Sequence, residues 1–162
     1  MFIHEHGVRL NMHSGPSAIP LPVLILIPLV AFAEIFIIFP VISRVSGWNA
    51  LAQRFRYDGP WNGHLWKFRS ARFPAFTNYN GCLNVGAGEH GLYLKPIWIV
   101  SYCHPPLLIP WHEITYRTEH GFFGEVTVLT LGSQEQIPCR IYRKLAADLA
   151  EAAAAHGCQQ TF

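Results

Sequence analysis

The sequence predicts an α+β protein: one apolar N-terminal helix, then a small antiparallel β barrel or sandwich of about six or seven strands, then a C-terminal α-helix. Three observations predict this class. Residues 19–42 are almost continuously apolar, the middle of the chain holds short alternating segments bounded by turn residues, and the alanine-rich end has a helical period. The 120 residues that follow the apolar run are enough for one small domain and too few for two.

The apolar run from Ile19 to Ile42 predicts a transmembrane helix. It has 24 residues, of which 17 are Leu, Ile, Val or Phe, and Glu34 is its one ionisable side chain. As a helix it would be about 36 Å long, whereas a bilayer core is about 30 Å thick. The carboxylate costs about 3 kcal/mol on insertion scales, while the apolar side chains contribute on the order of 5–10 kcal/mol. The interior Pro28 is expected to kink this helix.

A cleaved signal peptide is the rival interpretation of the run. It would need a basic start, an apolar stretch of about 7–15 residues and a small-x-small cleavage site. Here one Arg precedes a longer run, and Ser43-Arg44-Val45-Ser46-Gly47 is a poor cleavage site. The sequence therefore favours a membrane span.

Glu34 has two interpretations, which the sequence leaves open. Carboxylates within membranes usually face protein or water, so Glu34 could contact the helix of a membrane-protein partner or respond to protons. Alternatively, it is a protonated acid that lipid tolerates.

The charge distribution predicts the topology. Between Arg44 and Arg72 there are six basic residues opposed by one acid, Asp58, whereas Arg9 alone precedes the run. Basic residues collect on cytoplasmic flanks. We expect a single-pass protein of the inner (cell) membrane with its N-terminus outside. Its segments are an extracytoplasmic tail (1–18), the span (19–42), a juxtamembrane helix and linker (43–60), a cytoplasmic domain (61–157) and a polar tail (158–162).

Partners follow from the same charges. The net charge of +2 gives no argument for nucleic acid, so the expected partners are the lipid bilayer, anionic lipid headgroups and a membrane protein. The four cysteines lack C-x-x-C spacing and are expected to be reduced thiols.

The segment from Ser43 to Tyr57 predicts a short amphipathic helix with Ser46 as N-cap. Its apolar side chains recur at helical spacing on one face, at Trp48, Leu51, Ala52 and Phe55. Two interpretations stand equal. The helix lies on the anionic inner leaflet, with Trp48 at headgroup depth, or it packs on its own domain.

Strands are predicted at 64–73, 82–85, 91–95, 107–111, 114–117, 125–131 and 136–139, with a turn at Asn78-Tyr79-Asn80-Gly81. Residues 97–102 are expected to continue in an extended conformation. Pro110 indicates an edge or a bulge. From Arg140 to His156 the period becomes helical, with Ile141, Leu145, Leu149 and Ala152 on the apolar face and Gly157 as the stop.

Two segments resemble the pleckstrin-homology-like (PH-like) superfold, which includes bacterial PH and GRAM-like domains. In such domains one strand, with a proline followed by an aromatic residue, runs directly into the next strand. A similar segment here is His104-Pro105-Pro106-Leu107-Leu108-Ile109-Pro110-Trp111-His112-Glu113-Ile114. The start of another of their strands is similar to Gly88-Glu89-His90-Gly91-Leu92-Tyr93-Leu94. The resemblance covers roughly residues 61–156 and implies a PH-like domain. Small bacterial membrane proteins of unknown function share this layout. The basic phosphoinositide signature of eukaryotic PH domains is not matched, so no ligand residue carries over.

No catalytic, cofactor or metal site is predicted. Histidines cluster at His4-Glu5-His6 and His13, while His104, His112 and His120 are expected in turns or on the surface. The G-x-G-x-x-G motif at Gly86, Gly88 and Gly91 precedes a strand rather than a helix, so we interpret it as a hairpin turn.

The function predicted is that of a non-catalytic, membrane-anchored PH-like binding or scaffold module at the inner membrane surface, whose ligand is unknown. Its membrane or partner contacts are expected at Glu34, Arg44, Trp48, Arg54 and Arg56. The alternatives are a small membrane-bound enzyme with an unrecognised pocket and an accessory subunit of a membrane complex.

Overall fold

The computed structural model describes residues 20–121 and 124–155, apart from the side chains of residues 31, 34 and 35. The chain divides into two compact units after Ile35. The helices are α1 (Leu21–Val45), α2 (Trp48–Phe55) and α3 (Arg143–Ala155), and the strands are β1 (His64–Arg72), β2 (Asn78–Gly88), β3 (Gly91–Pro96), β4 (Leu107–Ile109), β5 (Ile114–Gly121), β6 (Gly124–Leu131) and β7 (Ile137–Tyr142).

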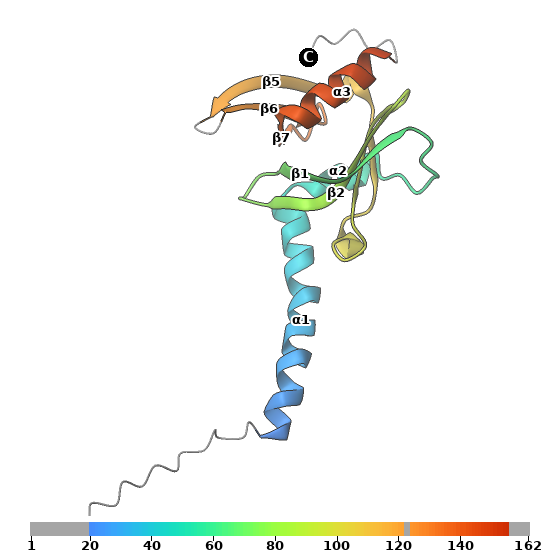
Figure 1. The fold of residues 1–162 in the computed structure, drawn as a ribbon. Helices are drawn as coiled ribbons and strands as arrows, with labels where there is room; N and C mark the ends of the chain where they lie inside the picture. The colour runs from blue at the N-terminus through green and yellow to red at the C-terminus, as the bar shows by residue number, and fades with distance from the viewer. Residues whose placement is uncertain (1–19, 122–123, 156–162) are drawn as a thin grey trace, which may run out of the picture. The chain divides into compact units, whose positions relative to one another are not determined.

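The described strands form one curled antiparallel half-barrel in the order β4-β3-β2-β1-β7-β6-β5 (Figure 1). Two meanders, β1–β4 and β5–β7, are joined where β1 pairs with β7 at Ala71 and Arg72. Helix α3 packs against β2, β6 and β7. The predicted α+β class, with about seven antiparallel strands and a C-terminal helix, is confirmed, and this arrangement is compatible with a PH-like fold.

The transmembrane prediction needs a correction. Among the residues that the structure describes, no helix is long and apolar enough to cross a membrane. The predicted span over 19–42 is therefore not supported.

Packing explains why the helix differs from the predicted span. Helix α1 extends to Val45, and its residues from Phe36 onward belong to the same unit as the half-barrel. There the hydroxyl group of Ser43 is buried and donates a hydrogen bond to the Cys103 carbonyl at 2.7 Å. The 15 helical residues that remain, Leu21–Ile35, extend for only about 22 Å at 1.5 Å per residue.

Helix α2 is shorter than predicted because Gly47 separates it from α1. Gly47 has φ +81°, and a Cβ there would overlap the side chain of Ile137. The chain therefore turns at Gly47, and Ser43–Val45 join α1. The apolar side chains of α2 (Trp48, Leu51 and Phe55) are buried in the core of the half-barrel. Of the two interpretations for this segment, the structure supports packing on its own domain.

The core lies inside the half-barrel, between the sheet and two helices. Helix α3 contributes Leu145, Leu149 and Ala153, and α2 contributes its apolar face from the other end of the chain. The predicted Ile141 also lies in the core, but it belongs to β7. Strand β7 runs to Tyr142 because Arg140–Tyr142 pair with β6, and Ile141 also pairs with β1, so α3 begins at Arg143 rather than Arg140.

Two further local predictions, one of a turn and one of an extended segment, were also wrong. The turn between β1 and β2 is not Asn78-Tyr79-Asn80-Gly81 but Pro74-Ala75-Phe76, closed by a hydrogen bond from the Phe73 amide to the Thr77 carbonyl. Residues 97–102 are not a strand. Amide and hydroxyl groups of Ser101 bond back to the carbonyls of Ile97 and Trp98, which makes a turn and then a short 3-10 helix, Ser101–Cys103.

The hairpin prediction for Gly86, Gly88 and Gly91 is confirmed. Strands β2 and β3 pair through Gly88 and Gly91 around the two-residue turn Glu89-His90. The glycines also have packing roles. The indole of Trp61 lies where a Cβ on Gly86 or Gly88 would be, and the carbonyl of Ile109 lies where a Cβ on Gly91 would be.

Candidate functional site

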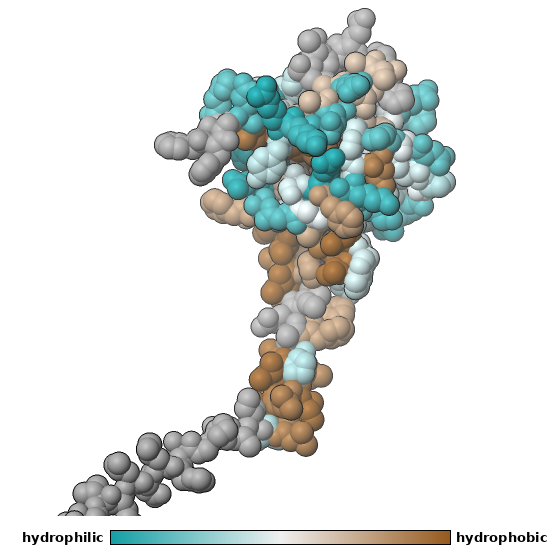
Figure 2. Space-filling model, in the orientation of Figure 1, coloured by the Kyte–Doolittle hydropathy of each residue, from teal (hydrophilic) through white to brown (hydrophobic). Residues whose placement is uncertain are grey.

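The described part of α1 presents apolar side chains in all directions. Four consecutive residues, Leu24 to Ile27, are 58%, 61%, 55% and 57% exposed. Because successive residues of a helix are about 100° apart, these four side chains cover its whole circumference. Figure 2 accordingly colours most of the described residues of α1 brown. An exposed apolar surface of this kind marks a site of contact with a membrane or another molecule.

A second group of exposed apolar side chains lies on two turns of the half-barrel unit. Phe76, in the turn after β1, is 98% exposed, and Trp98 and Tyr102, in the turn after β3, are 83% and 63% exposed. The ring of Tyr102 meets that of Phe36 in α1, with centroids 5.2 Å apart. An open groove of about 440 Å³ runs beside these residues, lined by Phe39, Ile42, Val45, Ala75, Phe76, Thr77, Asn78, Tyr79, Cys82 and Val100. The half-barrel unit therefore has an exposed apolar surface of its own, which includes these two turns and Phe36.

A polar pocket of about 430 Å³ lies at the end of α1, bounded by α2 and the turn before β4. Its lining residues are Pro40, Ser43, Arg44, Asn49, Ala52, Gln53, Arg56, Cys103 and Pro105. Arg44 lies in the last turn of α1 and Arg56 follows α2, so the break at Gly47 brings these two residues to one pocket. No acidic side chain lines it among the described residues.

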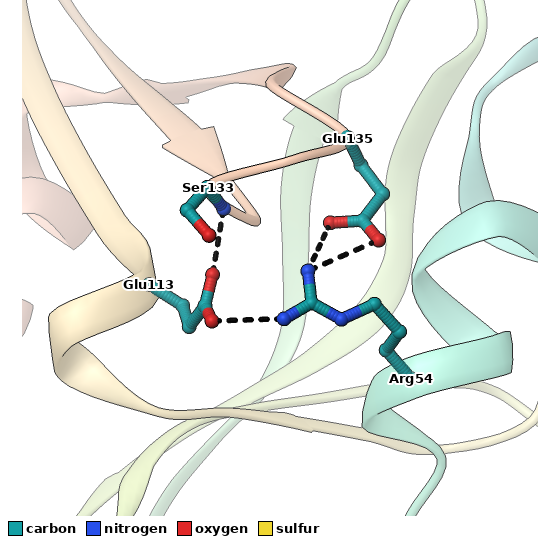
Figure 3. A network of polar contacts seen from close by, with 4 residues as sticks. All are labelled: Arg54, Glu113, Ser133 and Glu135. Carbon is teal, nitrogen blue, oxygen red and sulfur yellow. Dashed lines mark hydrogen bonds and ion pairs between the residues drawn. The ribbon is translucent and has the colours of Figure 1, made fainter.

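Arg54 belongs to a different site, an ion-pair network on the other side of α2 (Figure 3). Its guanidinium group donates to Glu113 at 3.0 Å and to Glu135 at 3.0 and 3.2 Å. Glu113 also accepts a hydrogen bond from the Ser133 amide at 2.6 Å. Hydrogen bonding by Ser133, followed by the charge of Arg54, lowers the pKa of the Glu113 carboxyl. Arg54 thus ties α2 to the segments before β5 and β7.

Trp48 lies in the core with none of its surface exposed, which corrects its prediction as a membrane contact. Its indole NH donates to the Pro105 carbonyl at 3.0 Å, and its ring packs on Phe73, Tyr79 and His104 at 5.5–5.6 Å between centroids. A tryptophan that ties a helix to its own domain is unavailable to the headgroup region.

His104 is buried, not a turn or surface residue as predicted. It is 0% exposed, and neither ring nitrogen makes a hydrogen bond of normal geometry to a described residue. Burial lowers its pKa to about 4, with the nearby Val100 carbonyl acting in the opposite direction. His104 is therefore neutral at physiological pH and acts as a core side chain.

The five residues predicted to contact a membrane or a partner therefore do not form one site. Arg44 and Arg56 share the polar pocket, Arg54 and Trp48 hold the domain together, and the side chain of Glu34 lies outside the described residues. The exposed Phe76, Trp98 and Tyr102 were missed as a surface. The signal available was that apolar residues flank the turn-forming Pro74 and Ser101, but residues 97–102 were expected to be extended.

Metal binding finds no support in the described part of the chain, where no three His, Cys, Asp or Glu side chains could hold an ion. The N-terminal histidines and Cys158 lie outside the described residues, and Cys82, Cys103 and Cys139 are free thiols. Burial raises the pKa of the Cys139 thiol to about 12, so it is a poor nucleophile.

Comparison with protein-family models finds no match, and comparisons with curated proteins and with solved structures also find none.

Proposed function

We propose that this protein is a non-catalytic binding or scaffold module that attaches to a lipid membrane through α1, with a PH-like half-barrel at the membrane surface. One observation carries the proposal: the apolar side chains of Leu24 to Ile27 are more than half exposed on every side of the helix. A protein groove would cover one face of such a helix, whereas acyl chains cover its whole circumference.

The turns of the half-barrel unit fit the same proposal. Trp and Tyr are enriched where a membrane meets water, because their rings combine an apolar body with a polar group. Trp98 and Tyr102 are exposed on one turn, and Tyr102 contacts α1 directly through Phe36. We propose that this turn lies at the membrane interface.

The side of the membrane follows from charge. Six basic residues lie between Arg44 and Arg72, which favours the cytoplasmic face of the inner membrane and its anionic lipids. The N-terminus lies outside the described residues, so its placement outside the cell stays a prediction. Contact of Glu34 with a membrane-protein partner also stays a prediction.

Vesicle flotation tests the proposal with the full-length chain. Purified protein is mixed with phosphatidylcholine in detergent, the detergent is removed, and the vesicles are floated on a density gradient. We expect the protein to float. Replacing Leu24, Ile25, Leu26 and Ile27 by Gln should abolish flotation, because each large apolar side chain contributes about 1.5–3 kcal/mol on transfer from water.

A matched control separates lipid from a protein partner. Exchanging Leu and Ile at the same four positions (Leu24→Ile, Ile25→Leu, Leu26→Ile, Ile27→Leu) preserves hydrophobicity but changes side-chain shape. Lipid should accept this variant as well as the wild type. The proposal is wrong if the wild type stays in the dense fraction or if the Gln variant floats with it.

A further inference from the structure

The pocket at the end of α1 combines two positive charges with a fixed shape. Arg44 and Arg56 line it from the ends of two different helices, and its described lining residues include no carboxylate. Arg56 does pair with Asp58, at 2.8 Å, but both side chains are more than 60% exposed. Such an exposed pair contributes little and can exchange for another anion.

The walls of the pocket are held in place by two hydrogen bonds. The Ser43 hydroxyl donates to the Cys103 carbonyl at 2.7 Å, and the Trp48 indole donates to the Pro105 carbonyl at 3.0 Å. These bonds fix the turn before β4 against both α1 and α2. A pocket whose walls are already ordered loses less entropy when a ligand binds.

Neutral donors accompany the two arginines. Asn49 and Gln53 lie four residues apart on α2, hence on one helix face, and both line the pocket. A planar guanidinium group offers paired N–H donors that match two oxygens of a phosphate, and amide NH₂ groups can donate to the remaining oxygens.

We propose that this pocket binds the phosphate group of an anionic phospholipid. Arg44 lies in the last turn of α1, so the membrane attachment proposed above would bring this pocket near the lipid headgroups. Two guanidinium groups favour a headgroup with net negative charge and repel the choline cation of a zwitterionic one. This proposal rests on membrane attachment through α1 and names the headgroup that accompanies it.

The test measures binding of short-chain lipids to the full-length protein in a neutral detergent. The probes are dioctanoyl phosphatidylglycerol, dioctanoyl phosphatidylcholine and inorganic phosphate, titrated by isothermal calorimetry. We expect phosphatidylglycerol to bind most tightly. Arg44→Gln and Arg56→Gln should each weaken its binding about tenfold or more, because each removes a charge-assisted hydrogen bond. Arg44→Lys, which keeps the charge, should weaken phosphatidylglycerol binding less than Arg44→Gln does.

Arg117→Gln is the matched control. Arg117 also pairs at 2.8 Å with an acid two residues later, Glu119, but lies on β5, outside the pocket. It should leave phosphatidylglycerol binding unchanged. Equal binding of phosphatidylcholine, or an equal loss in Arg117→Gln, overturns the proposal. If inorganic phosphate binds as tightly as phosphatidylglycerol, the proposal that the bound phosphate group belongs to a lipid is wrong. Thermal melts confirm that each variant is folded.

Flotation on phosphatidylcholine vesicles distinguishes this proposal from the proposed function. If the Arg44→Gln/Arg56→Gln double variant floats like the wild type and its lipid binding is also unchanged, the pocket proposal fails and membrane attachment stands. If the wild type does not float, attachment itself fails.

Discussion

Helices α1 and α2 are adjacent in sequence, and both are rich in large apolar residues, yet they use them in opposite ways. Helix α2 buries Trp48, Leu51 and Phe55 within the half-barrel core, while Leu24 to Ile27 of α1 stay more than half exposed. The difference lies in the pattern. The apolar residues of α2 share one face and leave Asn49 and Gln53 for a pocket, whereas those of α1 surround the helix. The one-sided pattern of α2 completes a core, whereas the apolar residues around α1 require an apolar environment on all sides of the helix.

The largest difference between the two helices is expected from truncating a large apolar side chain in each. Trp48→Ala should lower the free energy of unfolding of the half-barrel by about 3–5 kcal/mol, because it removes core contacts and the bond to Pro105. Ile25→Ala should change it by less than about 0.5 kcal/mol. Urea unfolding, monitored by far-ultraviolet circular dichroism, measures both. Equal effects would contradict the different roles of the two helices.

A pH-dependent effect is expected at His104, which packs on Trp48. Burial lowers its pKa from 6.5 to about 4. Above pH 6.5 the ring is neutral in both states. As pH falls from 6.5 to 4 the unfolded chain gains the proton first, so up to about 3 kcal/mol of stability is lost, and the loss is complete below pH 4.

His104→Phe should remove this pH dependence and leave stability at pH 7 nearly unchanged, since both orphaned nitrogens disappear. Urea unfolding across pH 4–7, compared with wild type, measures the difference. His112→Gln, on the surface, is the control. An unchanged pH profile in His104→Phe would refute the assignment.

A smaller effect is expected at Gly47, where α1 ends and α2 begins. Gly47→Ala should lower the free energy of unfolding by about 2 kcal/mol or more. A left-handed backbone conformation costs about 1–2 kcal/mol in a residue other than glycine, and the new methyl group would overlap Ile137. Gly81→Ala shares the positive φ, but its Cβ would meet nothing within 4 Å. Thermal or urea unfolding of the two variants should therefore differ. Equal costs would mean that the overlap contributes nothing.

The smallest effect is expected from Arg54, which anchors α2 to the rest of the domain. Arg54→Met should lower Tm by a few degrees, because Glu113 and Glu135 lose their shared partner, although the arginine is about one-third exposed (34%). Added salt screens the pairs, so the difference between Tm values should shrink as ionic strength rises. Calorimetry at low and high salt measures it, and a difference that is independent of salt would argue for lost packing instead.

Local patterns predicted the parts of the fold that depend on nearest neighbours. Alternation placed β1 within a residue of its bounds, and the G-x-G-x-x-G spacing before an apolar strand identified the β2–β3 hairpin. Patterns failed where distant segments decide. Ile141 has helical spacing to Leu145, but pairing with β1 and β6 keeps it in a strand. Residues 97–102 are rich in residues that favour strands, but bonds from Ser101 close them into a turn.

The candidate site followed the same division. Composition alone singled out the basic residues after the apolar run, but it could not show which of them make ion pairs within the domain and which line a pocket. Arg54 and Arg56 are two residues apart, and only the positions of Glu113 and Glu135 assign one to an ion-pair network and leave the other to the pocket. Trp48 fitted an interface as well as a core until the half-barrel was in place around it.

By itself the sequence determined that the first helix is apolar on all sides, that antiparallel strands follow it and that a helix ends the fold. These properties come from side-chain chemistry and spacing along a short stretch of chain. Only the tertiary structure decided that α1 joins the domain from Phe36 onward, that α2 seals the core and that Arg44 and Arg56 meet in one pocket. Those outcomes depend on which distant surfaces meet, and a local pattern contains no information on that.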